Sequence, residues 1–169
     1  MSAPAACTIR FAQPEDVPTI IGLIKGLAEY ERLSDAVVGT EELLREHLFG
    51  ARPYVETLLA EADGRPVGFA LFFHNYSTFL TRPGIYLEDL FVLPDERGRG
   101  YGKALLTALG RLAVERNCGR LEWSVLNWNE PSIQFYKSLG AVGMNEWTVN
   151  RVTGDALQQL ASMGPKVQG

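Results

Sequence analysis

A glycine-rich stretch with three basic residues is the first feature of this sequence that could do chemistry. Arg97-Gly98-Arg99-Gly100-Tyr101-Gly102-Lys103 follows an apolar run and leads into a stretch with helical period. Successive backbone N–H groups without side-chain bulk, at the positive end of a helix, form a cradle for an anion such as a pyrophosphate. The spacing is neither that of a Walker loop nor that of a Rossmann fingerprint. We therefore expect a pyrophosphate cradle of another kind.

Two adjacent carboxylates interrupt the apolar run just before this stretch. Burying an unpaired carboxylate is costly, so at least one of Glu88 and Asp89 should meet a partner, water or ligand. A carboxylate without a fixed cation partner can accept a proton from a bound group, as a general base does. The alternative is a carboxylate that is paired with Arg or Lys for structural reasons.

The hydrophobic pattern predicts strands and helices that position these residues. Asp63-Gly64 meets the positive-φ demand of a tight hairpin turn, and Thr40 can cap a helix that starts with Glu41. The predicted strands are 8–12, 55–62, 66–73, 85–92, 120–126 and 147–152, and the predicted helices are 14–31, 41–48, 102–117 and two that begin near 130 and 155. This order predicts a mixed α/β sheet with helices on its faces.

Length and composition restrict the class of protein. A chain of 169 residues with 46% hydrophobic content predicts one globular domain over residues 1–169. A net charge of -4 argues against nucleic-acid binding. The sequence shows neither a signal peptide nor an apolar run long enough to span a membrane, which predicts a cytoplasmic protein without a membrane partner. Cys7 and Cys118 lie far apart without metal-ligand spacing, so we expect no metal.

Two motifs resemble one enzyme family. Arg97, Gly100 and Gly102 match the R/Q-x-x-G-x-G/A pyrophosphate loop of the Gcn5-related N-acetyltransferases (GNAT), and residues 127–141 resemble the N-E-x-S-x-x-F-Y-x-x-x-G-A block of their C-terminal half. Within that superfamily, residues 28–35, 86–89 and 128–132 look like the diamine (spermidine/spermine and thialysine) acetyltransferases. The resemblance implies an α/β GNAT fold, with a mixed, mostly antiparallel sheet of six to seven strands, helices on both faces and a splayed pair of parallel strands.

The resemblance also implies a cosubstrate, acetyl-coenzyme A, and direct attack by the amine in a ternary complex. Glu88 would contact the amine or a water that accepts its proton, and Tyr136 would protonate the departing thiolate. Backbone from Leu90 to Val92 would pair with the pantetheine arm, and N–H groups near Leu90 would stabilise the charge that builds on the carbonyl oxygen. The implied cofactor contacts are Leu90, Phe91, Val92, Arg97, Gly98, Arg99, Gly100, Tyr101, Gly102, Lys103, Asn129, Glu130, Pro131, Ser132 and Tyr136.

The sequence indicates the acceptor of the acetyl group less specifically than the cosubstrate. The candidate substrate contacts are Tyr30, Glu31, Glu88, Asp89, Glu122, Trp123, Ser124 and Glu146. Acids beside aromatics suit a polyamine or a lysine-like amine, because carboxylates pair with ammonium groups and rings favour cations. Each acid by itself could equally be a solvated surface charge. Two other functions stay open, which are acetylation of a protein N-terminus or lysine, and a non-catalytic acyl-CoA-binding module. The resemblance also implies a homodimer.

Overall fold

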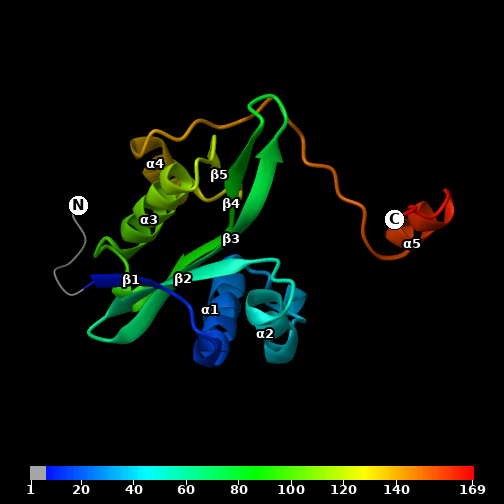
Figure 1. The fold of residues 1–169 in the computed structure, drawn as a ribbon. Coiled ribbons are helices and arrows are strands. Elements are labelled where there is room, and N and C mark those ends of the chain that lie inside the picture. The colour runs from blue at the N-terminus through cyan, green and yellow to red at the C-terminus, as the bar shows by residue number, and fades with distance from the viewer. Residues whose placement is uncertain (1–6) are drawn as a thin grey trace. The chain divides into compact units, whose positions relative to one another are not determined.

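A five-stranded mixed sheet organises the first part of the chain. The computed structural model describes residues 7–169, and the chain divides into two compact units, one ending at Ser124 and one beginning at Val125. The sheet belongs to the first unit and has the order β1-β2-β3-β4-β5, antiparallel except that β5 runs parallel to β4 (Figure 1). Its strands are β1 (Cys7–Phe11), β2 (Glu56–Ala62), β3 (Arg65–Ser77), β4 (Arg82–Val92) and β5 (Leu121–Trp123).

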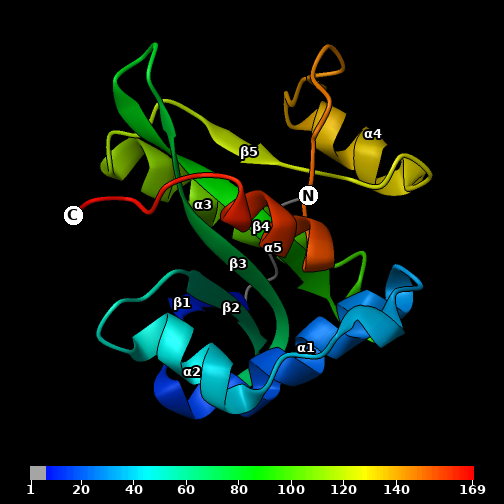
Figure 2. The same cartoon turned by 90° about the vertical axis from the view of Figure 1, so that its right-hand side faces the viewer.

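Helices cover both faces of this sheet, which confirms the predicted mixed α/β architecture with helices on both faces. Helices α1 (Val17–Tyr30) and α2 (Glu41–Phe49) lie on one face, and α3 (Tyr101–Glu115) lies on the other (Figures 1 and 2). Short 3-10 turns stand at Pro14–Asp16, Ser34–Ala36 and Pro94–Glu96. The second unit holds α4 (Glu130–Ser138) and α5 (Gly154–Ser162). Within residues 7–169, no helix is both long and apolar enough to cross a membrane.

Local sequence signals for turns and caps are confirmed. Thr40 Oγ1 accepts a hydrogen bond of 3.2 Å from the backbone N–H of Leu43, which satisfies one free donor at the start of α2. Asp63 and Gly64 both have positive φ, 51° and 76°, as a two-residue hairpin turn with the twist of its flanking strands requires.

The predicted strand count is wrong. The described residues form five strands, because the segment 147–152 is irregular and exposed, and β5 covers only part of the predicted 120–126. Alternating apolar residues make a strand only where a neighbouring strand can accept their backbone hydrogen bonds. Residues 147–152 have no such partner among the described residues. The prediction of a single domain stays a prediction.

A β-bulge in β4 sets the direction of the carboxylates. Leu87 lies opposite Phe72 and Asp89 lies opposite Leu71, so Glu88 is an extra residue in the ladder between β3 and β4. Leu71 belongs to the core cluster beneath α1 and α2, and residues directly opposite each other share a face of the sheet. The bulge therefore turns Asp89 toward the α1 face, while the fully buried Leu87 keeps to the α3 face.

Phe91 joins β4 to α1 at a site where α1 needs a glycine. A Cβ on Gly26 would lie 2.9 Å from Cε1 of the Phe91 ring, which is itself only 4% exposed. Gly26→Ala is therefore expected to destabilise the protein by about 1 kcal/mol or more, because overpacking outweighs the gain in helix propensity. Gly22 is the matched control, since a Cβ there would meet nothing within 4 Å.

Urea unfolding of the two variants measures this difference. Gly22→Ala is expected to raise the midpoint by an amount that corresponds to about 0.5–1 kcal/mol, and Gly26→Ala is expected to lower it. Equal stabilisation by both substitutions would show that the ring of Phe91 does not pack against α1.

Candidate functional site

Half of β4 presents an open edge. The parallel pairing with β5 covers Ile85↔Leu121, Tyr86↔Glu122 and Leu87↔Trp123, whereas β4 continues to Val92. Beyond Leu87, no strand in the described part of the chain pairs with this side of β4. The other side of Leu90, Phe91 and Val92 is held by β3, with Leu90 opposite Ala70. A fixed strand with a free row of N–H and C=O groups can bind an extended chain of amides.

The glycine loop follows this open edge directly. Gly98 and Gly100 have φ of 77° and 88°, in the left-handed region where a side chain is strained. Gly100 is the N-cap of α3, so the N–H groups of Tyr101, Gly102 and Lys103 have no partner within the helix. A Cβ on Gly98 would meet nothing within 4 Å, so open space lies beside the backbone. These features fit the predicted anion cradle.

Ion pairs fix the start of the loop to the neighbouring hairpin. The carboxylate of Glu96 is only 7% exposed and lies 2.5 Å from Nη2 of Arg65 and 3.1 Å from Nη1 of Arg99. Only the contact with Arg65 has hydrogen-bond geometry, which leaves Oε2 of Glu96 without a hydrogen bond among the described residues. Arg99 is thus held by Glu96 at the base of the loop.

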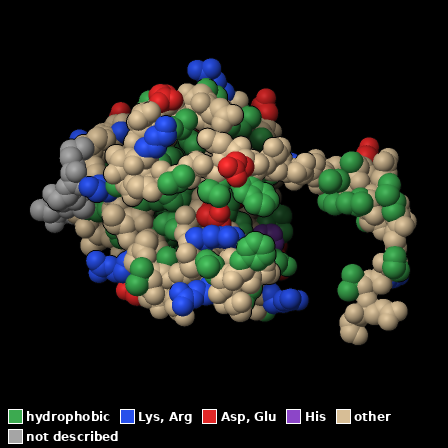
Figure 3. Space-filling model, turned by 90° about the horizontal axis from the view of Figure 1, so that it is seen from above, with side chains coloured by type: hydrophobic (Ala, Val, Ile, Leu, Met, Phe, Trp, Pro, Cys, Tyr) green, Lys and Arg blue, Asp and Glu red, His purple; other side chains and the backbone are tan. Residues whose placement is uncertain are grey.

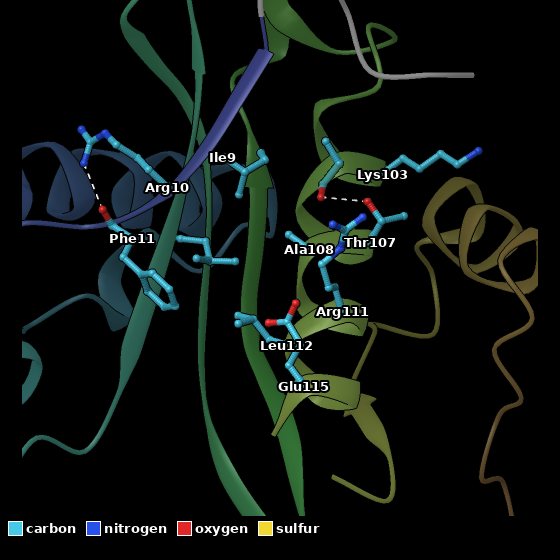
Figure 4. Close-up of a pocket in the computed structure, with 11 residues that line it drawn as sticks. Ile9, Arg10, Phe11, Lys103, Thr107, Ala108, Arg111, Leu112 and Glu115 are labelled. Atoms are coloured by element: carbon cyan, nitrogen blue, oxygen red, sulfur yellow. Dashed lines mark hydrogen bonds between the residues drawn. The ribbon is translucent and has the colours of Figure 1, made fainter. Parts of the chain in front are cut away.

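Lys103 lines a groove between α3 and β1. The groove has a volume of about 680 Å³, and its walls come from the outer face of α3 and from β1 and β2 (Figure 4). Its apolar surface is formed by Ile9, Phe11, Leu58, Ala104, Ala108 and Leu112. Contact between Lys103 and a pyrophosphate stays a prediction.

Three acids come together at the end of α1. Burial, together with the nearby charges of Glu88 and Glu31, raises the pKa of Asp89 to about 6. Burial also raises the pKa of Glu31, which is the C-cap residue of α1. No cation among the described residues forms an ion pair with Glu31, Glu88 or Asp89. The site therefore concentrates negative charge that the chain itself does not neutralise.

The two carboxylates of β4 have different surroundings. The Glu88 residue is exposed at the bulge, whereas Asp89 is half-buried on the α1 side. A buried carboxylate beside like charges gains most from a cation, because the cation removes both the burial penalty and the repulsion. Binding of an ammonium group should therefore stabilise the charged form of Asp89 more than that of Glu88.

The candidate substrate contacts in and just after β5 differ in whether they already have a partner in the protein. Glu122 accepts a hydrogen bond of 3.0 Å from Nδ2 of Asn75 and pairs with Nε of Arg120 at 2.6 Å, so its charge is already compensated. The Ser124 hydroxyl lies 2.8 Å from the phenol of Tyr86. Trp123 is the half-buried last residue of β5, opposite Leu87.

The predicted cofactor residues of the second unit gather at the start of α4. Asn129 is 7% exposed and its Oδ1 accepts a hydrogen bond of 3.4 Å from the Ser132 N–H, which makes it the N-cap. Glu130 and Pro131 form the first turn. Tyr136 lies in the last turn, with its ring centroid 5.5 Å from that of Phe135, and Glu146 is exposed beyond the helix. Tyr136 and Glu88 belong to different units.

A family model matches the part of the chain that holds the open strand edge and the glycine loop. The model described as "Acetyltransferase (GNAT) family" matches residues 23–141. The chain belongs to the GNAT family. The GNAT match includes the second half of α1, β4, the glycine loop and α4, and it makes the chain an N-acetyltransferase.

Relatives of this GNAT chain include proteins named as acetyltransferases of thialysine and L-ornithine. A thialysine N-epsilon-acetyltransferase of Bos taurus is 40% identical over 164 residues, which cover 90% of this chain and 96% of that protein. L-ornithine N5-acetyltransferase NATA1 of Arabidopsis thaliana is 36% identical over 197 residues, with 90% and 86% covered. Among solved structures, an integron cassette protein from the mobile metagenome of V. cholerae superposes with a TM-score of 0.79 at 27% identity, covering 94% of this chain and 99% of that one.

Sequence reasoning about this GNAT chain missed Tyr86. Its phenol faces Ser124, and its ring centroid lies 5.2 Å from that of Phe73. The alternation of the apolar residues Ile85 and Leu87 with Tyr86 was a usable signal in the sequence, because successive side chains of a strand point to opposite faces.

Proposed function

We propose that this chain transfers the acetyl group of acetyl-CoA to a primary amine of a small molecule, such as a polyamine, thialysine or a lysine-like amine. The carrying observation is the acid trio Glu31, Glu88 and Asp89, which lies beside the open edge of β4 without a cation partner among the described residues. Ammonium groups bind carboxylates through short, charge-assisted hydrogen bonds. The named substrates of the two relatives above support the same class.

In this proposal, different groups of the protein bind the amine, remove its proton and stabilise the charge that develops on the carbonyl oxygen. Asp89 and Glu31 hold the ammonium end, and Tyr30, the last residue of α1, directly precedes Glu31 in the chain. The exposed Glu88 takes the proton of the amine, directly or through water, so that the nitrogen can attack the thioester carbonyl. The fixed N–H groups near Leu90 stabilise the charge that develops on the carbonyl oxygen.

Departure of the thiolate requires a proton, and Tyr136 is our candidate donor. Asn129 and Ser132 orient α4, from whose last turn Tyr136 extends. Transfer is direct, without an acetylated cysteine. Burial raises the pKa of Cys7, which keeps its thiol protonated, and a protonated thiol is a poor nucleophile.

We also propose a homodimer, on the family resemblance and on the surface of the second unit. Trp147 is 77% exposed, Val149 is 83% exposed and Leu160 is 53% exposed, and hydrophobic side chains gather over α5 (Figure 3). Large exposed apolar side chains mark candidate interaction surfaces, and in this proposal a second copy of the chain covers this one. The cytoplasmic location stays a prediction.

Release of free coenzyme A against a panel of amines tests the proposed function. The panel holds spermidine, putrescine, thialysine, lysine and a histone-tail peptide, and wild type is compared with Glu88→Gln and Tyr136→Phe. We expect turnover with at least one small amine and a fall in kcat of about 100-fold in each variant, which is the range of general acid–base catalysis.

Other outcomes would replace the proposal. Turnover of the histone-tail peptide alone would favour a protein acceptor. Binding of acetyl-CoA without turnover of any amine would favour the non-catalytic acyl-CoA-binding module.

A further inference from the structure

One arginine side chain links the glycine loop to the end of α1. The guanidinium carbon of Arg97 lies 4.5 Å from the ring centroid of Tyr30 and 5.4 Å from that of Phe91. Its Nε donates a hydrogen bond of 3.1 Å to the carbonyl oxygen of Val92, the last residue of β4. Arg97 therefore touches α1 and β4 while its own backbone begins the loop.

The contacts of Arg97 fix the position of its guanidinium group but do not neutralise its charge. Arg97 forms no ion pair within residues 7–169, unlike its neighbour Arg99, which pairs with Glu96. Two rings and one carbonyl hold a planar guanidinium by stacking and a single hydrogen bond. A charge held in this way stays available to an anion that enters the adjacent loop.

The α1 end of this link is the acceptor side of the proposed site. Tyr30 directly precedes Glu31, and the charge of Glu31 acts on Asp89. Phe91 also packs against Gly26 of α1, so the ring that Arg97 covers is part of the contact between α1 and β4. A shift of the Arg97 side chain would therefore change the surroundings of Tyr30 and of the neighbouring Glu31.

We propose that Arg97 is a positioning residue that couples occupation of the glycine loop to binding of the amine. This inference rests on the proposed function. An anion in the loop anchors Arg97, Arg97 in turn orders Tyr30, and the ordered end of α1 binds the amine more tightly. Coupling between two sites is reciprocal, so the amine must tighten binding of the loop's ligand by the same factor.

Isothermal titration calorimetry measures this factor with coenzyme A and thialysine as the probes. The Kd of thialysine is determined with and without saturating coenzyme A, and the Kd of coenzyme A with and without saturating thialysine. For wild type we expect the two ratios to agree and to be about fivefold or larger. Arg97→Ala is expected to bring both ratios to about one. Arg97→Lys keeps the charge but lacks the planar stack, and should recover only part of the coupling.

Changes on the Tyr30 side test the same link from its other end. Tyr30→Leu removes the ring and is expected to abolish the coupling as Arg97→Ala does, whereas Tyr30→Phe keeps the ring and the coupling. The matched control is Arg99→Ala, which removes a cation from the same loop that does not contact Tyr30. It should weaken coenzyme A binding while leaving the coupling ratio at the wild-type value.

The outcomes separate this inference from the proposed function. If Arg97→Ala weakens coenzyme A by the same factor with and without thialysine, Arg97 is only a ligand of the anion, and the inference is overturned. A wild type without coupling overturns it as well. If instead no amine is turned over in the kinetic panel, the proposed function fails first. A melting curve checks that Arg97→Ala is folded. If it is not, the comparison of Tyr30→Leu with Tyr30→Phe tests the coupling instead.

Discussion

Asp89→Asn is expected to lower kcat/KM for the amine by about 100-fold, because a buried ammonium–carboxylate pair contributes roughly 3 kcal/mol. The substitution keeps the shape of the side chain and removes the charge that would bind the ammonium group. The loss should fall mainly on binding of the amine, with little change in the Kd of acetyl-CoA. Steady-state kinetics with thialysine as the varied substrate measure it.

The same variant is expected to be more stable than wild type at neutral pH. The pKa of Asp89 is raised to about 6 by burial and by Glu88 and Glu31, above its ordinary value near 4. A protonated Asp89 is thus favoured in the folded state, and its stabilising contribution is present below about pH 4 and lost as the pH rises through about 6. Asp89→Asn avoids that loss, which amounts to about 1–3 kcal/mol.

The free energy of unfolding of wild type and of Asp89→Asn, measured from pH 4 to pH 8, tests this prediction. The stability advantage of Asp89→Asn should grow between about pH 4 and pH 6 and then stay constant. Asp35→Asn, at an exposed position in the 3-10 turn after α1, is the control and should show no such trend. An Asp89→Asn variant that is less stable than wild type at pH 7 would mean that the carboxylate has a cation partner in the folded protein.

Gly100→Val is expected to raise the Kd of acetyl-CoA by about 100-fold or more, which corresponds to about 2.7 kcal/mol. Gly100 has φ of 88° at the N-cap of α3, and a β-branched side chain there costs about 1–2 kcal/mol in backbone strain alone. Relief of that strain moves the loop's N–H groups out of alignment, so the binding loss should exceed the strain itself. Titration calorimetry of the variant measures it.

Gly110→Ala is the matched control in the same helix. A Cβ on Gly110 would meet nothing within 4 Å, and alanine favours a helix interior by about 0.5–1 kcal/mol. We expect Gly110→Ala to be more stable and to bind acetyl-CoA as wild type does. Binding by Gly100→Val at wild-type strength would rule out the loop as the pyrophosphate cradle.

Features that depend on neighbours in the chain could be predicted from the sequence. The cap at Thr40, the hairpin at Asp63-Gly64 and the glycine loop ahead of α3 each rest on the backbone preference of a few consecutive residues. The match of Arg97, Gly100 and Gly102 to a family pattern is also a local property, and the family model confirms it. Apolar alternation, in contrast, wrongly predicted a strand at 147–152, because alternation does not say whether a pairing strand exists.

The site's electrostatics depend on strand register, which the sequence did not reveal. Adjacent Glu88 and Asp89 looked like equivalent candidates, and the family resemblance singled out Glu88. The bulge between β3 and β4 separates them, turning Asp89 toward the end of α1 and Glu31 and leaving Glu88 exposed. The sequence by itself determined the family, the loop and the residue types, because these are set by local chain chemistry. Only the tertiary structure decided which carboxylate is buried and that Arg97 stacks on Tyr30, because both depend on contacts between residues far apart in the chain.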